Sequence, residues 1–141
     1  MNDMEQRIAE SFGRQGMMQT LGARLAMVAE GEVHIAMPFN TGLSQQNGFA
    51  HAGAVTSIVD SAAGYAALTR APSPGHDLVT VEFKVNFMRP ALGARFVAVG
   101  RVVQAGKTMA VTTGEVRAFA GAGEDYKVVA LLQATMVYIA P

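Results

Sequence analysis

The sequence predicts an α+β fold in which a curved, mainly antiparallel sheet wraps around one long helix. The helix is expected at about residues 51–69, where small and apolar residues lie on nearly all sides and loops flank both ends. A helix of that composition must be covered nearly all round, and a curling sheet can cover it. Residues 33–39 and 79–87 alternate apolar and polar residues with the period of a strand, and further strand candidates follow toward the C-terminus. With 141 residues, we expect one domain over 1–141.

The N-terminal elements are predicted to be a short helix and a hairpin. Apolar residues recur every four positions between charged ones over residues 3–12, which indicates an amphipathic helix that the glycines after it end. Residues 24–39 are typical of two strands joined by a turn at Glu30 and Gly31, because the second half alternates apolar and polar residues. A polar loop then leads to the long helix.

The C-terminal half is predicted to be strands. Residues 79–87 show the clearest alternation, which places their valines and phenylalanines on one face and Thr80 on the other. Three more strands are expected at 95–104, 108–119 and 127–139, and glycine-containing turns join them. Together these segments predict a meander of antiparallel hairpins.

Composition excludes several classes of function. The chain has 11 basic and 11 acidic residues, so no basic patch is available for nucleic acid or a membrane surface. It has no cysteine, which excludes disulfides and thiolate chemistry, and its histidines show no metal-ligand spacing. The N-terminus lacks the features of a signal peptide, and no apolar run reaches transmembrane length. We therefore expect a cytoplasmic protein without a metal.

Asp60 is the one charged residue between positions 52 and 69. Burying a carboxylate costs roughly several kcal/mol unless the group is paired, protonated or used in the function of the protein. Its face of the predicted helix carries small residues, which leave room for a ligand or for another backbone. At the helix start, after His51, unpaired backbone N–H groups could stabilise an oxyanion. A carboxylate and an oxyanion donor on one helix suggest acyl chemistry, although an isolated acid can also be purely structural.

Two stretches resemble a known family. "HAGAVTSIVDSAAGYAA" resembles the HGG-type signature of hotdog-fold thioesterases of the phenylacetic-acid-pathway-like and four-hydroxybenzoyl-CoA-thioesterase-like group, in which an acid follows the histidine by nine positions. "VTVEFKVNFMRPALG" resembles the strand that follows the helix in that group. The resemblance implies a sheet wrapped around the helix, and hydrolysis of an aryl- or short- to medium-chain acyl-CoA without a cofactor.

The resemblance also implies a role for each matching residue. It makes Asp60 the nucleophile or general base, the Ala52 N–H the donor to the thioester carbonyl, and Thr80 a group that holds substrate or water. Ala52 replaces the first glycine of the motif. Its methyl group narrows the approach of a substrate to the backbone, but the N–H donor is kept. Gln46 is our choice for the loop amide that contacts the carbonyl or the attacking water. Other substrate contacts are expected at Gln45, Asn47, His51, Gly53, Arg89 and Lys107, the last two for CoA phosphates.

Members of this group build their sites between subunits, so the resemblance implies a homodimer at least, with a tetramer expected. Exposed sheet edges make such self-association physically reasonable. Two alternatives remain at this level. A noncatalytic hotdog protein would bind acyl-CoA without turnover. A hotdog hydratase or dehydratase would need a catalytic histidine across from the acid, and the sequence lacks that spacing.

Overall fold

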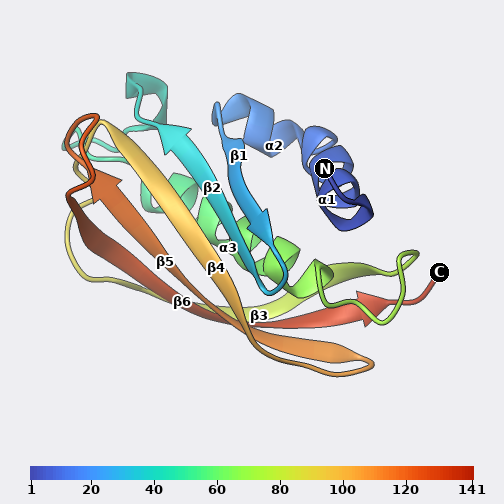
Figure 1. Cartoon of the computed structure of the whole chain (residues 1–141). Coiled ribbons are helices and arrows are strands. Elements are labelled where there is room, and N and C mark those ends of the chain that lie inside the picture. Colours follow the sequence, from blue (N-terminus) through green and yellow to red (C-terminus); the bar gives the residue numbers. More distant parts are fainter.

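The computed structural model describes residues 1–141 and contains one curved antiparallel sheet of six strands around a central helix (Figure 1). This arrangement confirms the predicted α+β class. Along the sheet the strands follow in the order β1 (Arg24–Ala29), β2 (Glu32–Pro38), β4 (Arg95–Ala105), β5 (Met109–Phe119), β6 (Tyr126–Ile139) and β3 (Asp77–Phe87).

The central helix, α3 (Ala52–Leu68), agrees with the predicted helix to within one residue at each end. The other helical segments are α1 (Asp3–Gly13), α2 (Gly16–Thr20) and the short 3-10 helix η1 (Thr41–Leu43). The sequence did not predict α2, which begins at one of the glycines expected to end the first helix. Its formation buries Met18, which is 1% exposed. No helix is both long and apolar enough to cross a membrane.

Two glycines let α3 lie directly on the sheet. Gly100 in β4 and Gly114 in β5 are partners in the ladder between those strands. A Cβ atom at Gly100 would lie 2.3 Å from the carbonyl carbon of Ala62, and one at Gly114 would lie 2.6 Å from Cγ2 of Val59. Real Cβ atoms do not come this close, so any larger residue here would push the helix away. The glycine pair therefore fixes how deeply α3 sits in the sheet.

Strand β3 lies at an edge of the sheet and pairs with β6, whereas the meander is confined to β4, β5 and β6. A bulge at Val81 interrupts its alternation, because Thr80 pairs with Met136 and Glu82 with the next residue, Thr135. The bulge moves Thr80 to the inner face, which it shares with Phe83. The expectation that Thr80 lies on the opposite face from the phenylalanines is therefore wrong, because the alternation of residue types does not reveal an extra residue within a strand.

Candidate active site

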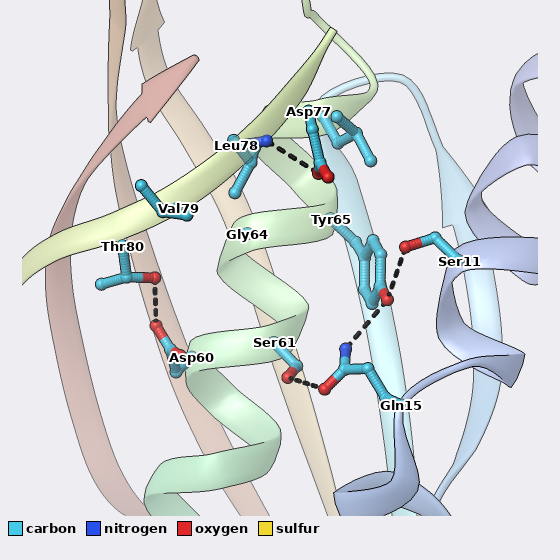
Figure 2. Close-up of a pocket in the computed structure, with 11 residues that line it drawn as sticks. Ser11, Gln15, Asp60, Ser61, Gly64, Tyr65, Asp77, Leu78, Val79 and Thr80 are labelled. Atoms are coloured by element: carbon cyan, nitrogen blue, oxygen red, sulfur yellow. Dashed lines mark hydrogen bonds between the residues drawn. The ribbon is translucent and has the colours of Figure 1, made fainter. Parts of the chain in front are cut away.

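Asp60 lies half-buried on α3 and faces the first half of β3 (Figure 2). The Thr80 hydroxyl donates a hydrogen bond of 2.8 Å to Oδ1 of Asp60 and lies 3.1 Å from Sδ of Met136. This contact depends on the bulge in β3, which turns Thr80 inward. Two residues that the sequence singled out separately are thus brought together.

The electrostatics of Asp60 suit a reactive carboxylate. Burial raises the pKa of its carboxyl above the ordinary value of 3.8, and the Thr80 hydrogen bond opposes that rise by stabilising the ionised form. No cation lies within ion-pair distance of Asp60. A partly desolvated carboxylate without a counter-ion is a better base and nucleophile than a paired one.

Asp60 and Thr80 line a pocket of about 240 Å³ between α3, β3 and the N-terminal helices. Figure 2 shows them on one side of α3 and a polar cluster on the other, with Gly64 between. The cluster is defined by hydrogen bonds: the Gln15 amide donates to the Tyr65 hydroxyl over 2.8 Å, Ser11 shares a bond of 3.1 Å with that hydroxyl, and Ser61 donates to Gln15 over 3.5 Å.

Sequence reasoning missed this polar cluster. Gln15 belongs to the loop between α1 and α2, and Tyr65 lies 50 positions later on α3. No local pattern connects two residues so far apart in the sequence. A buried tyrosine needs a partner for its hydroxyl, so Tyr65 could have signalled that a polar group lies nearby, but not which one.

The first turn of α3 provides one free backbone donor. His51 is the N-cap, and its Nδ1 accepts a hydrogen bond of 2.8 Å from the Gly53 N–H. The His51 carbonyl accepts from Ala54 and Val55 over 3.0 and 3.2 Å. The N–H of Ala52 alone has no partner, and Ala52 is exposed. The Ala52 N–H expected from the sequence as the donor is therefore free, and His51 accepts the hydrogen bonds of the other N–H groups in the first turn.

A second pocket, of about 300 Å³, lies at this end of α3. Ala52, Gln45 and Arg89 are among its lining residues. The Gln45 side chain accepts hydrogen bonds from two backbone N–H groups of its own loop, so its amide shapes that loop. Gln46 and Asn47 are exposed and do not line the pocket. The role of Gln46 stays a prediction.

The structure separates several of the predicted site residues within one chain. Asp60 lies eight residues after Ala52 on the same helix, a distance of about 12 Å along the axis. The two pockets that they line share no residue. Arg89 follows the end of β3, whereas Lys107 lies in the turn between β4 and β5, at the opposite end of the sheet (Figure 1).

Comparison with known proteins identifies the family. Residues 47–123 match the model of the Thioesterase superfamily. The crystal structure of a thioesterase family protein from Silicibacter pomeroyi is 40% identical, with a TM-score of 0.92 over 98% of this chain and 99% of that one. The E. coli PaaI protein, from the phenylacetic acid degradation operon, shares the fold at 21% identity, with a TM-score of 0.84 over 97% of this chain and 94% of that one.

Curated relatives agree with this match. A protein of Thermoplasma volcanium that carries an esterase name is 32% identical over 100 residues, which are 70% of this chain and 73% of that protein. The family model covers more than half of the chain and confirms the resemblance found in the sequence. This protein therefore belongs to the thioesterase superfamily and is a hydrolase with the hotdog fold.

Proposed function

We propose that the protein hydrolyses the thioester of an aryl- or short- to medium-chain acyl-CoA to the free acid and CoA. The observation that carries the proposal is the half-buried Asp60, which has no counter-ion, is held by Thr80 and faces a pocket. Asp60 either takes a proton from the attacking water or attacks the carbonyl carbon itself to form an anhydride that water then cleaves. The C–S bond breaks in both routes, and the thiolate leaves and takes up a proton.

The size of the Asp60 pocket supports a small acyl group. Its volume of about 240 Å³ lies below the usual range for drug-sized ligands, roughly 300 to 1,000 Å³. The pocket can therefore enclose an acyl group but not a whole CoA thioester. No histidine lines it, which disfavours the hydratase or dehydratase alternative.

The proposed site combines two copies of the chain, because the Ala52 N–H and Asp60 are too far apart to meet one carbonyl group. Thr80 lies near one end of the edge strand β3, and Phe87, at its other end, lines the Ala52 pocket. Antiparallel pairing of β3 with β3 of a second copy, centred between these residues, would bring the Asp60 half of one subunit against the Ala52 half of the other. Exposed apolar side chains on β3, including Val81 at 56% exposure, favour such pairing.

Thiol release from a panel of aryl- and alkanoyl-CoAs tests the reaction. Asp60→Asn is expected to lower kcat by about 10²-fold or more, because it removes the base or nucleophile. The asparagine can still accept the Thr80 hydrogen bond, so the variant should fold. A wild type that binds these thioesters without releasing thiol would favour the noncatalytic alternative. An Asp60→Asn variant as active as the wild type would refute the role of Asp60.

Subunit mixing tests the composite site. Ala52→Pro removes the N–H donor at the first helical position, where proline is accepted. The ψ of 138° at His51 already suits a residue before proline. Mixing Ala52→Pro with Asp60→Asn should restore about a quarter of wild-type activity, since half of the dimers would carry one intact site of two. Ala52→Gly, which keeps the N–H, is the matched active control. Mixtures as inactive as the separate variants would refute a site shared between subunits.

A further inference from the structure

The Thr80 hydroxyl lies between two hydrogen-bond acceptors of different strength. Its oxygen is 2.8 Å from Oδ1 of Asp60 and 3.1 Å from Sδ of Met136. A threonine hydroxyl carries a single hydrogen, so it can donate to only one of these acceptors at a time. An ionised carboxylate is a strong acceptor, whereas a thioether sulfur is a weak one. While Asp60 is ionised, the hydrogen therefore points to the carboxylate.

The sheet holds the Met136 sulfur beside this hydroxyl. Met136 on β6 is the ladder partner of Thr80 on β3, and both side chains point to the inner face of the sheet. Met136 is 0% exposed, so water does not compete for its sulfur. A leucine would fill a similar volume in the core but would offer no acceptor. The sulfur is therefore a fixed second acceptor for the Thr80 hydroxyl.

The charge of Asp60 decides between the two acceptors. In the general-base route, Asp60 takes a proton from the water whose oxygen bonds to the carbonyl carbon. It remains a neutral acid until the C–S bond breaks and the proton passes to the thiolate. Hydrogen bonds to a neutral oxygen are about half as strong as those to a charged one. Once Asp60 is neutral, the Thr80 hydrogen can turn to the sulfur, and the Thr80 oxygen is then free to accept a bond from the acid.

We propose that Met136 is a positioning residue for the reaction, because its sulfur accepts the Thr80 hydrogen bond while Asp60 is protonated. The inference rests on the proposed function and on its general-base route. An acceptor that is used in the protonated state stabilises that state, so Asp60 remains a stronger base than it would be with the Thr80 bond alone. Met136 acts through Thr80 and touches no reacting atom.

Few other groups that titrate lie near Asp60. Those of the same chain come from three elements that pack together: Tyr65 on α3, Asp77 on β3 and Tyr138 on β6. The N-terminal helices and the loop between them line the pocket with uncharged side chains, and β2, β4 and β5 bury no charged residue against α3. In the proposed dimer, the Ala52 pocket of the second copy would add His51 and Arg89, which line it. All of these groups stay the same when Met136 is changed.

NMR titration of isotope-labelled aspartate carboxyl groups tests the proposal without any turnover, and Asp60→Asn identifies the Asp60 signal. Met136→Leu removes the acceptor and keeps an apolar side chain of similar size, so the pKa of Asp60 should fall. Thr80→Val should raise that pKa, because the carboxylate loses its hydrogen bond. In the Thr80→Val background, Met136→Leu should have no further effect, because the sulfur acts only through the hydroxyl. Met37→Leu is the matched control, since Met37 is equally buried but lies on β2.

The pH dependence of thiol release connects this hydrogen bonding with the reaction. Met136→Leu should move the acid limb of the kcat/KM profile to lower pH, opposite to the movement expected for Thr80→Val. It should also lower kcat about threefold with KM unchanged, because a weaker base takes the proton less readily. Met37→Leu should change neither the limb nor kcat.

Three results would overturn the role of Met136. Asp60 could titrate in Met136→Leu as it does in the wild type, or its pKa could change equally with and without the Thr80 hydroxyl. The third is a changed titration with an unmoved acid limb. If no thioester were cleaved but the pKa of Asp60 fell in Met136→Leu and not in the double variant, the hydrogen bonding would be supported and the proposed reaction refuted.

Discussion

Replacing Gly100 by alanine should both destabilise the protein and impair its site, because Gly100 touches the backbone of α3. The new Cβ would lie 2.3 Å from the carbonyl carbon and 2.4 Å from the carbonyl oxygen of Ala62. Ordinary contacts of a Cβ atom begin at 3.4 Å. Backbone atoms cannot rotate aside as a side chain can, so α3 and β4 must separate by at least about 1 Å at this point.

This separation sets the expected magnitudes. Overpacking of a core costs roughly 1–3 kcal/mol, and a contact with backbone belongs at the upper end. For a chain of this size the melting temperature should fall by about 4 °C per kcal/mol, so a loss of about 10 °C is expected. Asp60 lies two positions before Ala62, whereas Thr80 belongs to another element. Misplacement of Asp60 relative to Thr80 by about 1 Å can lower kcat up to 10²-fold. This loss is larger than the loss of activity expected from a small unfolded fraction of the protein.

Thermal unfolding and thiol release, measured on the same preparations, check this reasoning. Gly13→Ala is the matched control, because nothing lies within 4 Å of the added Cβ. Gly114→Ala provides a second test, since its Cβ would meet the Val59 side chain at 2.6 Å and a Val59→Ala change should relieve the clash. If Gly100→Ala left both the melting temperature and kcat unchanged, the close packing of α3 on the glycine pair would be refuted.

Four further outcomes are expected. Burial raises the pKa of Asp60 in the folded protein, so the free energy of unfolding falls as pH rises through and above 3.8, the ordinary value. Asp60→Asn, which is neutral at every pH, should therefore raise the melting temperature at pH 7 but not below pH 3.8. An equal gain at both pH values would contradict this reasoning. Thr80→Val should move the acid limb of the kcat/KM profile to higher pH by raising the pKa of Asp60, whereas Thr80→Ser should not; an unmoved limb would exclude the hydrogen bond. Tyr138→Phe removes a bond of 2.7 Å to the Ala67 carbonyl and should cost about 1 kcal/mol in denaturant unfolding, and no loss would mean that the bond contributes nothing. Val81→Lys should yield an inactive monomer by sedimentation, while a fully active dimer would rule out pairing along β3.

The sequence predicted the parts of the fold that depend on local pattern. The long helix was found because its composition differs from that of its flanking loops over many residues. β3 was found because it alternates clearly, and β4, β5 and β6 because glycine-containing turns separate strand-like stretches. The pairing of β3 with β6 was not found, because strand neighbours are chosen by long-range contacts. The bulge at Val81 was also missed, since one extra residue changes which face each side chain occupies without changing the composition.

The site was predictable to a similar extent. Asp60 stood out as a lone charge in an apolar helix, and the nine-residue spacing from His51 connected it with the family. Asp60 and the Ala52 N–H were expected to act together because both lie on one helix, but a rise of 1.5 Å per residue places them about 12 Å apart along its axis in one chain. Gln15 could not be found, because it belongs to a loop distant in the sequence from Asp60 and Tyr65.

The partners of two other carboxylates in the chain help to explain why Asp60 is unpaired. Glu32 is paired with Arg101 at 2.7 Å and Glu115 with Arg117 at 2.9 Å, and the Arg101 hydrogen bond is the main cause of the lowered pKa of Glu32. Both glutamates are half-buried, with side chains that are 30% and 21% exposed, and both have an arginine partner. Asp60, where desolvation is larger, has only a hydroxyl partner. A cation there would stabilise the fold but would also lower the basicity and nucleophilicity of the carboxylate. The unpaired state of Asp60 is therefore better explained by reactivity than by stability.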